Sequence, residues 1–229
     1  MVDVRKKVEE ITPEITQMRV HIHENPELSM KEYNTCALLE DYVKKNVKYD
    51  RLKRVGETGL FFELKGTKPG NGPTIVFRGD IDALPIQEDE HMSPRSKVPG
   101  VMHACGHDVH GTINVGAAKI LSEMKDQFSG SIYFFIQPAE EILQGAKLFL
   151  NDPEIDFDKI DAVAALHVSA ELDAGTIGVR YGAILASADG IRIRINGKGG
   201  HGAHCHTLRD PIVASAAVIN ALQTLVSRE

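Results

Sequence analysis

Short apolar runs alternate with helical patterns along most of the chain, and this alternation restricts the possible folds more than any other feature. Four runs have the length and composition of β-strands: GLFFELKG (59–66), TIVFRGD (74–80), SIYFFIQ (131–137) and AVAALHV (162–168). Apolar residues at helical spacing predict a helix over about 113–124, and ILQGAKLFLND (142–152) predicts another. Strands that alternate with helices favour an α/β fold with a mainly parallel, twisted sheet flanked by helices. Because AVAALHV is apolar almost throughout, we expect this strand to be buried on both faces.

Two helices are expected before the first of these strands. Apolar residues spaced by three and four predict an amphipathic helix over 4–22, although it contains Pro13. The segment ENPEL ends this helix, and a second helix is expected over about 31–45. We interpret Cys36, within the second helix, as an inert core thiol.

A different pattern begins with DGIRIRING (189–197), where isoleucines alternate with polar residues as in a strand with one buried face. The glycine-rich GKGGHGAHCH (197–206) follows, and PIVASAAVINALQTLVSR (211–228) predicts a helix. We therefore expect a catalytic domain over residues 1–186. Residues 187–229 are expected to begin a small, incomplete α+β domain.

Acidic residues and a histidine gather where the predicted strands end. Asp80 closes TIVFRGD and Asp82 follows it, Glu140 and Glu141 come after SIYFFIQ, and His167 lies near the end of AVAALHV. Ligands of open α/β sheets bind at the carboxyl ends of the strands, because the loops converge there. These segments are therefore expected to form one crevice. The two aspartates are expected either to orient ligands or to cap a turn.

The stretch VMHACGHDVH (101–110) carries three histidines, a cysteine and an aspartate directly before a predicted helix. So many polar groups are costly to bury without partners, and a metal ion would supply one. Cys105 and His107 are good ligands for zinc and the later first-row metals. Glu141 and His167 would complete a mixed set, which is more typical of catalytic than of structural sites. Three other histidines are expected to support the ligands or to lie at the surface: His103, His110 and the solvated His91.

The adjacent carboxylates of Glu140 and Glu141 indicate hydrolysis. Neighbouring side chains point in different directions, so one carboxylate can bind a metal while the other reaches the water that the metal activates. The metal lowers the pKa of this water, and the second carboxylate can take its proton and pass it to a leaving group. Alone, such a pair is more often a solvated helix start, and His167 alone is more often a core histidine. Their combination with CGHD favours the functional interpretation.

Charge and composition exclude other classes of protein. The net charge of -6, with interspersed signs, argues against binding to nucleic acid or an anionic membrane. No apolar run approaches the roughly 20 residues of a membrane span, and MVDVRKKVEE lacks the apolar centre of a secretory signal. Three widely separated cysteines are expected to be free thiols: Cys36, Cys105 and Cys205. We therefore expect a cytoplasmic protein with a small-molecule partner.

Six motifs resemble, in order and spacing, the amidohydrolase branch of the M20 metallopeptidases: HIHENPELS, FRGDIDALP, GVMHACGHDVH, QPAEE, LHV and GKGGHGAH. This branch contains hippurate hydrolases, auxin-amino-acid conjugate hydrolases, N-acyl-amino-acid amidohydrolases and N-acetyldiaminopimelate deacetylases. The resemblance covers nearly all 229 residues. It implies a zinc-peptidase-like catalytic domain, a lid through which subunits form a homodimer, and N-acyl amino acids as substrates.

The resemblance also implies the roles of individual residues. Four positions match the metal ligands, with the thiolate placed to serve two ions: Cys105, His107, Glu141 and His167. Glu140 matches the general base and acid. His201 matches a lid histidine that reaches a neighbouring subunit's active site and stabilises the oxyanion. The implied cofactors are two divalent metal ions, Zn²⁺ or Mn²⁺, and Ni²⁺ or Co²⁺ would also suit this ligand set.

Two features depart from the family pattern. Cys205 stands where members usually have proline, which leaves the lid loop less constrained. Family enzymes are also longer, and their last metal-ligating histidine has no counterpart here, because His204 and His206 belong to the lid loop. An alternative is therefore an inactive, truncated fragment that binds metal or a partner without turnover. A purely structural zinc domain is disfavoured, because the predicted sheet is large enough to be stable without metal.

Overall fold

The computed structural model describes residues 2–184 and 190–226, and the chain divides into two units, Met1–Asp173 and Ala174–Glu229. The first unit contains a five-stranded sheet with helices on both of its faces. The predicted α/β fold class is confirmed by this unit. Within the described residues, no helix combines the length and the apolar character that crossing a membrane requires.

The sheet has the strand order β1-β2-β4-β3-β5. Its strands are β1 (Arg51–Val55), β2 (Gly59–Lys65), β3 (Thr74–Asp80), β4 (Ser131–Gln137) and β5 (Ala162–Ala165). Strands β4, β3 and β5 run parallel to one another, whereas β2 is antiparallel to both β1 and β4. The sequence pattern misses β1, because RLKRV is largely charged and forms a strand only by pairing with β2.

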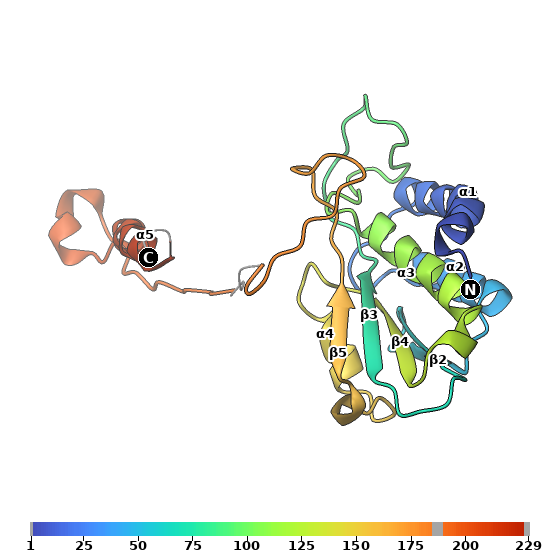
Figure 1. Cartoon of the computed structure of the whole chain (residues 1–229). Helices are drawn as coiled ribbons and strands as arrows, with labels where there is room; N and C mark the ends of the chain where they lie inside the picture. The colour runs from blue at the N-terminus through green and yellow to red at the C-terminus, as the bar shows by residue number, and fades with distance from the viewer. Residues whose placement is uncertain (1, 185–189, 227–229) are drawn as a thin grey trace. The chain divides into compact units, whose positions relative to one another are not determined.

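Three helices cover one face of the sheet (Figure 1): α1 (Val4–Glu24), α2 (Tyr33–Asn46) and α3 (His107–Ser122). Helix α3 packs on β3 and β4, α2 packs on β2 and α3, and α1 packs on α3. The Asp3 side chain caps α1 by accepting a hydrogen bond from the Lys6 N–H at 3.2 Å. Helix α1 continues through Pro13. The two helices expected before the first strand are therefore confirmed.

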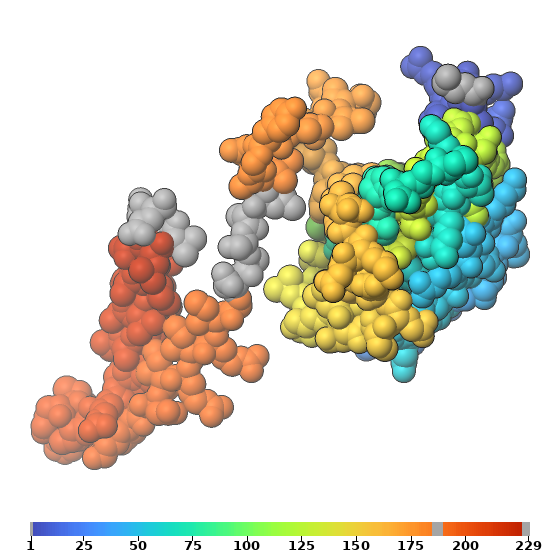
Figure 2. Space-filling view, turned by 60° about the horizontal axis from the view of Figure 1, so that its bottom comes forward, coloured from blue at the N-terminus to red at the C-terminus, as the bar shows by residue number. Residues whose placement is uncertain are grey.

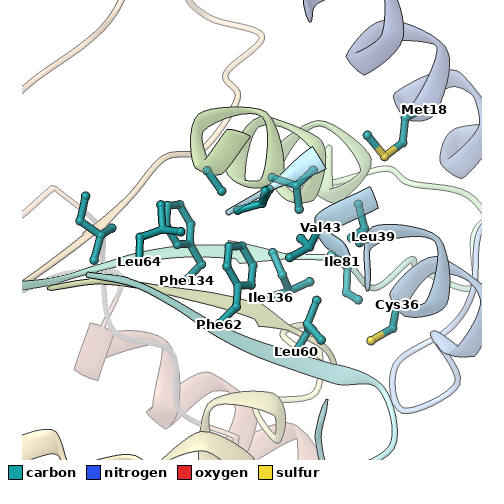
Figure 3. Packing of buried hydrophobic residues seen from close by; sticks show 14 of the residues in the cluster. Met18, Cys36, Leu39, Val43, Leu60, Phe62, Leu64, Ile81, Phe134 and Ile136 are labelled. Carbon is teal, nitrogen blue, oxygen red and sulfur yellow. The ribbon is translucent and has the colours of Figure 1, made fainter. Parts of the chain in front are cut away.

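The core between the sheet and these helices is built from every second residue of the central strands. Leu60, Phe62 and Leu64 of β2 face it together with Phe134 of β4, and the rings of Phe62 and Phe134 stack at 4.7 Å (Figure 3). Cys36 is fully buried beside them, as expected for a core thiol.

The opposite face of the sheet carries a second apolar cluster. Phe61 and Phe135, which alternate with the residues of the first cluster, pack here with Phe149 of α4 (Gly145–Leu150). Helix α4 is shorter than the predicted segment 142–152. Short 3-10 turns, η1 (Lys125–Gln127) and η2 (Phe157–Lys159), complete the connections of this unit.

The expectation that AVAALHV is buried on both faces is wrong. All four residues of β5 are exposed, and Val163 is 67% exposed. The reason is positional: among the described residues, β5 is an edge strand and β3 is its single partner. A continuously apolar run indicates a strand but does not show whether helices cover it.

In the second unit the structure describes the 3-10 turn η3 (Gly202–Thr207) and helix α5 (Pro211–Val226). The predicted C-terminal helix, drawn toward the red end of the colour scale in Figure 2, is confirmed. Its apolar side chains are exposed along much of its length. The predicted strand DGIRIRING is wrong over its described residues 190–197, which form no ladder, because a strand needs a hydrogen-bonded neighbour. Its first residue lies outside the described part of the chain. The domain boundary between residues 186 and 187 stays a prediction.

Candidate metal centre

The carboxyl ends of three parallel strands lie level at one edge of the sheet. Asp80, the last residue of β3, pairs with Gln137, the last residue of β4, and Arg78 pairs with Ala165 at the end of β5. The segments after these strands carry the acidic residues and the histidine that the sequence singled out. Helix α3 begins at the same edge with His107.

His107 is oriented by a buried aspartate. Its Nδ1 lies 3.1 Å from Asp82 Oδ1, and because a carboxylate only accepts, Nδ1 carries the proton. The other ring nitrogen, Nε2, lies 3.8 Å from Glu141 Oε1 and 3.9 Å from Glu140 Oε2. This second ring nitrogen thus faces three carboxylates, because Asp80 Oδ2 also lies 3.7 Å from it.

Cys105 and His167 meet beside this imidazole. The Cys105 Sγ lies 3.3 Å from His167 Nε2, while His167 Nδ1 donates to the carbonyl of Val168 at 2.7 Å. Gly106, between the two predicted ligands of the loop, has φ +81°, and a Cβ there would lie 2.3 Å from Val168 Cγ2. Only glycine meets both requirements without strain.

Asp80 and His110 tie β3 to the segment that carries His167. Asp80 Oδ1 accepts from His110 Nδ1 at 2.6 Å, and its Oδ2 pairs with Arg78 at 2.6 Å. His110 Nε2 in turn accepts from the Val168 N–H at 3.0 Å. Both ring nitrogens of His110 are therefore used, and its ring lies 4.5 Å from that of His167. His110 acts here as a buried structural support.

Possible ligand atoms form three groups within the described part of the chain, and His107 belongs to all of them. In each group they lie within 4.8 Å of one another: Cys105, His107 and His167; Asp80, His107 and His110; His107, Glu140 and Glu141. The first and third groups contain all four ligands expected from the sequence, with Glu140 beside them. The structure therefore brings these residues together around one imidazole.

Burial and negative charge shape the electrostatics of the centre. Burial, Glu141 and Glu140 raise the pKa of the Cys105 thiol to about 11. Burial also raises the pKa of Glu141. The nearby His107 lowers this pKa, whereas the charge of Glu140 raises it further. For His107, burial lowers the pKa, but the hydrogen bond to Asp82 and the surrounding carboxylates outweigh it and raise the value. All three groups respond to an excess of negative charge that a cation would offset.

Two unpaired buried atoms show that a divalent cation fits this centre. His107 Nε2 and Glu141 Oε1 are buried and have no hydrogen-bond partner. Leaving both atoms unpaired costs stability, whereas a cation between them would pair with each. Thiolate, imidazole and carboxylate together form a ligand set for Zn²⁺ and related metals.

The three histidines of the glycine-rich loop belong to the second unit. His201 is exposed, and its Nδ1 accepts a hydrogen bond from the Ala203 N–H at 3.1 Å. The rings of His201 and His204 lie 5.7 Å apart. The oxyanion role of His201 stays a prediction.

Sequence reasoning missed a buried network next to the centre. His23 Nδ1 lies 2.9 Å from Asp108 Oδ2, and its Nε2 lies 2.9 Å from Glu88 Oε1. His103 is also buried, with no hydrogen-bond partner for either ring nitrogen. The motif HIHENPELS contains His23 and could have marked it as a functional residue. The motif does not show that His23 contacts Asp108 and Glu88. His91 is exposed, as expected.

Comparison with known proteins shows which family the chain resembles. The model of peptidase family M20/M25/M40 matches residues 76–228. N-acetyl-L-cysteine deacetylase of Bacillus subtilis is 41% identical over 214 residues, which are 92% of this chain and 50% of that protein. N-acyl-L-amino acid amidohydrolase of Geobacillus stearothermophilus is 38% identical over 226 residues, 99% of this chain and 60% of that protein. The chain thus spans about half of these relatives.

A solved structure of an M20 family peptidase is also similar to this chain. The Bacillus subtilis YXEP protein, described as a dinuclear metal binding peptidase from the M20 family, superposes with a TM-score of 0.69 and 36% identity. The match covers 75% of this chain and 47% of that protein. From its sequence, fold and clustered ligands, the chain belongs to peptidase family M20/M25/M40.

Proposed function

We propose that the chain forms the metal-binding part of an amidohydrolase that cleaves the amide bond of N-acyl amino acids. The products are a carboxylic acid and a free amino acid. The observation that carries the proposal is the convergence of Cys105, His107, Glu141 and His167 with Glu140 beside them. Relatives named as an amidohydrolase and a deacetylase of N-acylated amino acids support this class of substrate.

The residues divide the work between holding metal and moving a proton. Cys105, His107, Glu141 and His167 would hold two divalent ions, Zn²⁺ or Mn²⁺, with Ni²⁺ or Co²⁺ as further candidates. When bound, such ions polarise the acyl carbonyl and make water more acidic. Glu140 is the least buried carboxylate of the centre, with a side chain 35% exposed against 18% for Glu141. It is therefore placed to accept a proton from water and to deliver it to the leaving amine.

The test is amino acid release by the purified chain. With added Mn²⁺ or Zn²⁺, it should release amino acid from N-acetyl or N-benzoyl amino acids, and Glu140→Gln should lower kcat at least about 100-fold. The matched control is Glu154→Gln, which changes a remote glutamate whose side chain is 64% exposed. This control should leave turnover unchanged.

The main competing outcome is a chain that binds metal but does not turn over substrate. That result would support the alternative of an inactive fragment and would leave hydrolysis to the longer relatives. Wild-type turnover that Glu140→Gln does not change would contradict the assigned proton carrier.

We also propose a cytoplasmic homodimer that forms through the second unit. The three free cysteines support a reducing compartment. The exposed apolar side chains of α5 support association, because such a surface is stabilised by a partner. His201 is proposed to reach a neighbouring subunit's substrate and stabilise its oxyanion. Light scattering should give the mass of a dimer, and a chain without residues 174–229 should be monomeric.

A further inference from the structure

A buried carboxylate far from the metal ligands in sequence contacts the turn that carries them. Glu32 precedes α2 as its N-cap residue and is fully buried. Its Oε1 accepts a hydrogen bond from the Ala139 N–H at 2.8 Å and another from the Met30 N–H at 3.0 Å. The bond to Ala139 joins residues 107 positions apart in the chain.

The backbone at Ala139 needs this support. Ala139 has φ +50°, a left-handed conformation that costs free energy for any residue with a Cβ. Its carbonyl accepts from the N–H groups of Gln144 and Gly145 at 3.2 and 3.1 Å. The strained residue therefore closes a turn, and Glu140 and Glu141 lie within that turn.

A second carboxylate holds the other side of the same turn. Asp82 Oδ2 accepts from the Glu141 N–H at 3.1 Å, while Asp82 Oδ1 contacts His107. Backbone hydrogen bonds from the two sides thus bracket Glu140. A shift of this turn would change the 3.8 Å separation between Glu141 Oε1 and His107 Nε2.

We propose that Glu32 is a positioning residue that fixes the Glu140–Glu141 turn through the Ala139 N–H. The proposal rests on the proposed function for the meaning of the two glutamates, but its geometry is independent of turnover. Glu32 belongs to none of the three groups of possible metal ligands in the described part of the chain. It holds the backbone from which the proton carrier and one ligand project.

The chain offers matched variants. In Glu32→Ser the shorter side chain cannot contact the Ala139 N–H. Serine is favoured at a helix N-cap, so α2 should still begin at the same residue. Glu32→Gln retains an acceptor oxygen and serves as the conservative variant. Glu63→Ser is the control, since Glu63 is also buried and accepts from the Ser131 Oγ at 2.8 Å, at the far end of β4.

The first measurement is amide hydrogen exchange by NMR in the metal-free chain. In Glu32→Ser, exchange at Ala139 should accelerate about tenfold relative to the amides of β4, the effect of losing one hydrogen bond. Glu32→Gln should show a smaller change. Equal acceleration in Glu63→Ser, or none in Glu32→Ser, would overturn the proposal.

The second measurement is calorimetric titration with Mn²⁺ or Zn²⁺. Glu32→Ser should weaken metal affinity about 10- to 100-fold, as loss of an outer support of a metal site does. Glu63→Ser should leave affinity unchanged. If wild type is active but Glu32→Ser keeps its metal affinity and its Ala139 exchange rate, the inference fails while the proposed function stands. If wild type shows no turnover but both differences are found, the proposed function fails and the positioning role stands.

Discussion

At the scale of single residues, the spacing of the metal centre depends on Gly106. The glycine has φ +81° and lies directly against Val168, which follows the predicted ligand His167. The sequence CGH shows two potential ligands separated by one residue, but it does not show why that residue is glycine. The contact with Val168, which is distant in the sequence, supplies the reason.

We therefore expect Gly106→Ala to destabilise the chain by more than the about 1–2 kcal/mol that a left-handed backbone costs for alanine. The additional loss comes from the clash of the new Cβ with Val168. Gly100→Ala is the matched control, because Gly100 has φ +73° and a methyl group added there would meet no atom within 4 Å apart from its two chain neighbours. Urea denaturation measures both free energies of unfolding. Equal losses in the two variants would show that the contact with Val168 is unimportant.

The predicted ligands illustrate how far single residues can be interpreted from sequence. The residue types of Cys105, His107, Glu141 and His167 indicated metal chemistry, and their positions after strands indicated a common edge. The support of His107 by Asp82 was one of two alternatives, and the structure shows that Asp82 both orients this ring and caps the turn at Glu141. Glu32 is not singled out by the sequence, because a glutamate in the first turn of a predicted helix resembles many solvated ones.

At the scale of elements, His23 joins three segments. It lies in the last turn of α1, and its ring contacts Asp108 in α3 and Glu88 in the loop after β3. Both contacts are carboxylates, which only accept, so they favour the protonated ring, in which both nitrogens donate. The hydrogen bond to Asp108 raises the pKa of His23, and Glu88 adds to it, against burial and the charge of Arg19.

This arrangement predicts a pH-dependent stability. Because the folded pKa lies above the ordinary value of 6.5, the contribution of His23 is fully present below pH 6.5 and is lost as pH rises through the folded pKa. The unfolding free energy of wild type minus that of His23→Gln should therefore shrink between pH 6 and pH 9. His91→Gln, at an exposed histidine, should show no such trend. A difference that is constant or grows with pH would contradict the assignment.

At the scale of the whole molecule, the two units differ in what stabilises them. Every buried side chain in the described ranges 2–184 and 190–225 belongs to the first unit, and so do the four predicted metal ligands. The second unit exposes the apolar side chains of α5. The free energy of the hydrophobic core is therefore supplied by residues 1–173.

A chain of residues 1–173 should unfold cooperatively, with a urea midpoint close to that of the full chain, and should keep its affinity for Mn²⁺. The reason is that this segment contains the complete sheet, both apolar clusters and the metal centre. Circular dichroism and calorimetric titration provide the measurements. A broad transition or a large loss of metal affinity would show that the second unit contributes to the fold or to the centre.

The local properties of the chain can be predicted from its residues alone: the helical periods, the apolar strands and the chemistry of the loop at 101–110. These follow from side-chain type and spacing, which act over a few residues. Contacts between distant segments were needed to establish that β5 is an exposed edge, that β1 is a strand, and that Glu32 binds the turn near residue 139. Each of these depends on which distant segment becomes a neighbour, and burial and hydrogen bonding are set by that neighbour.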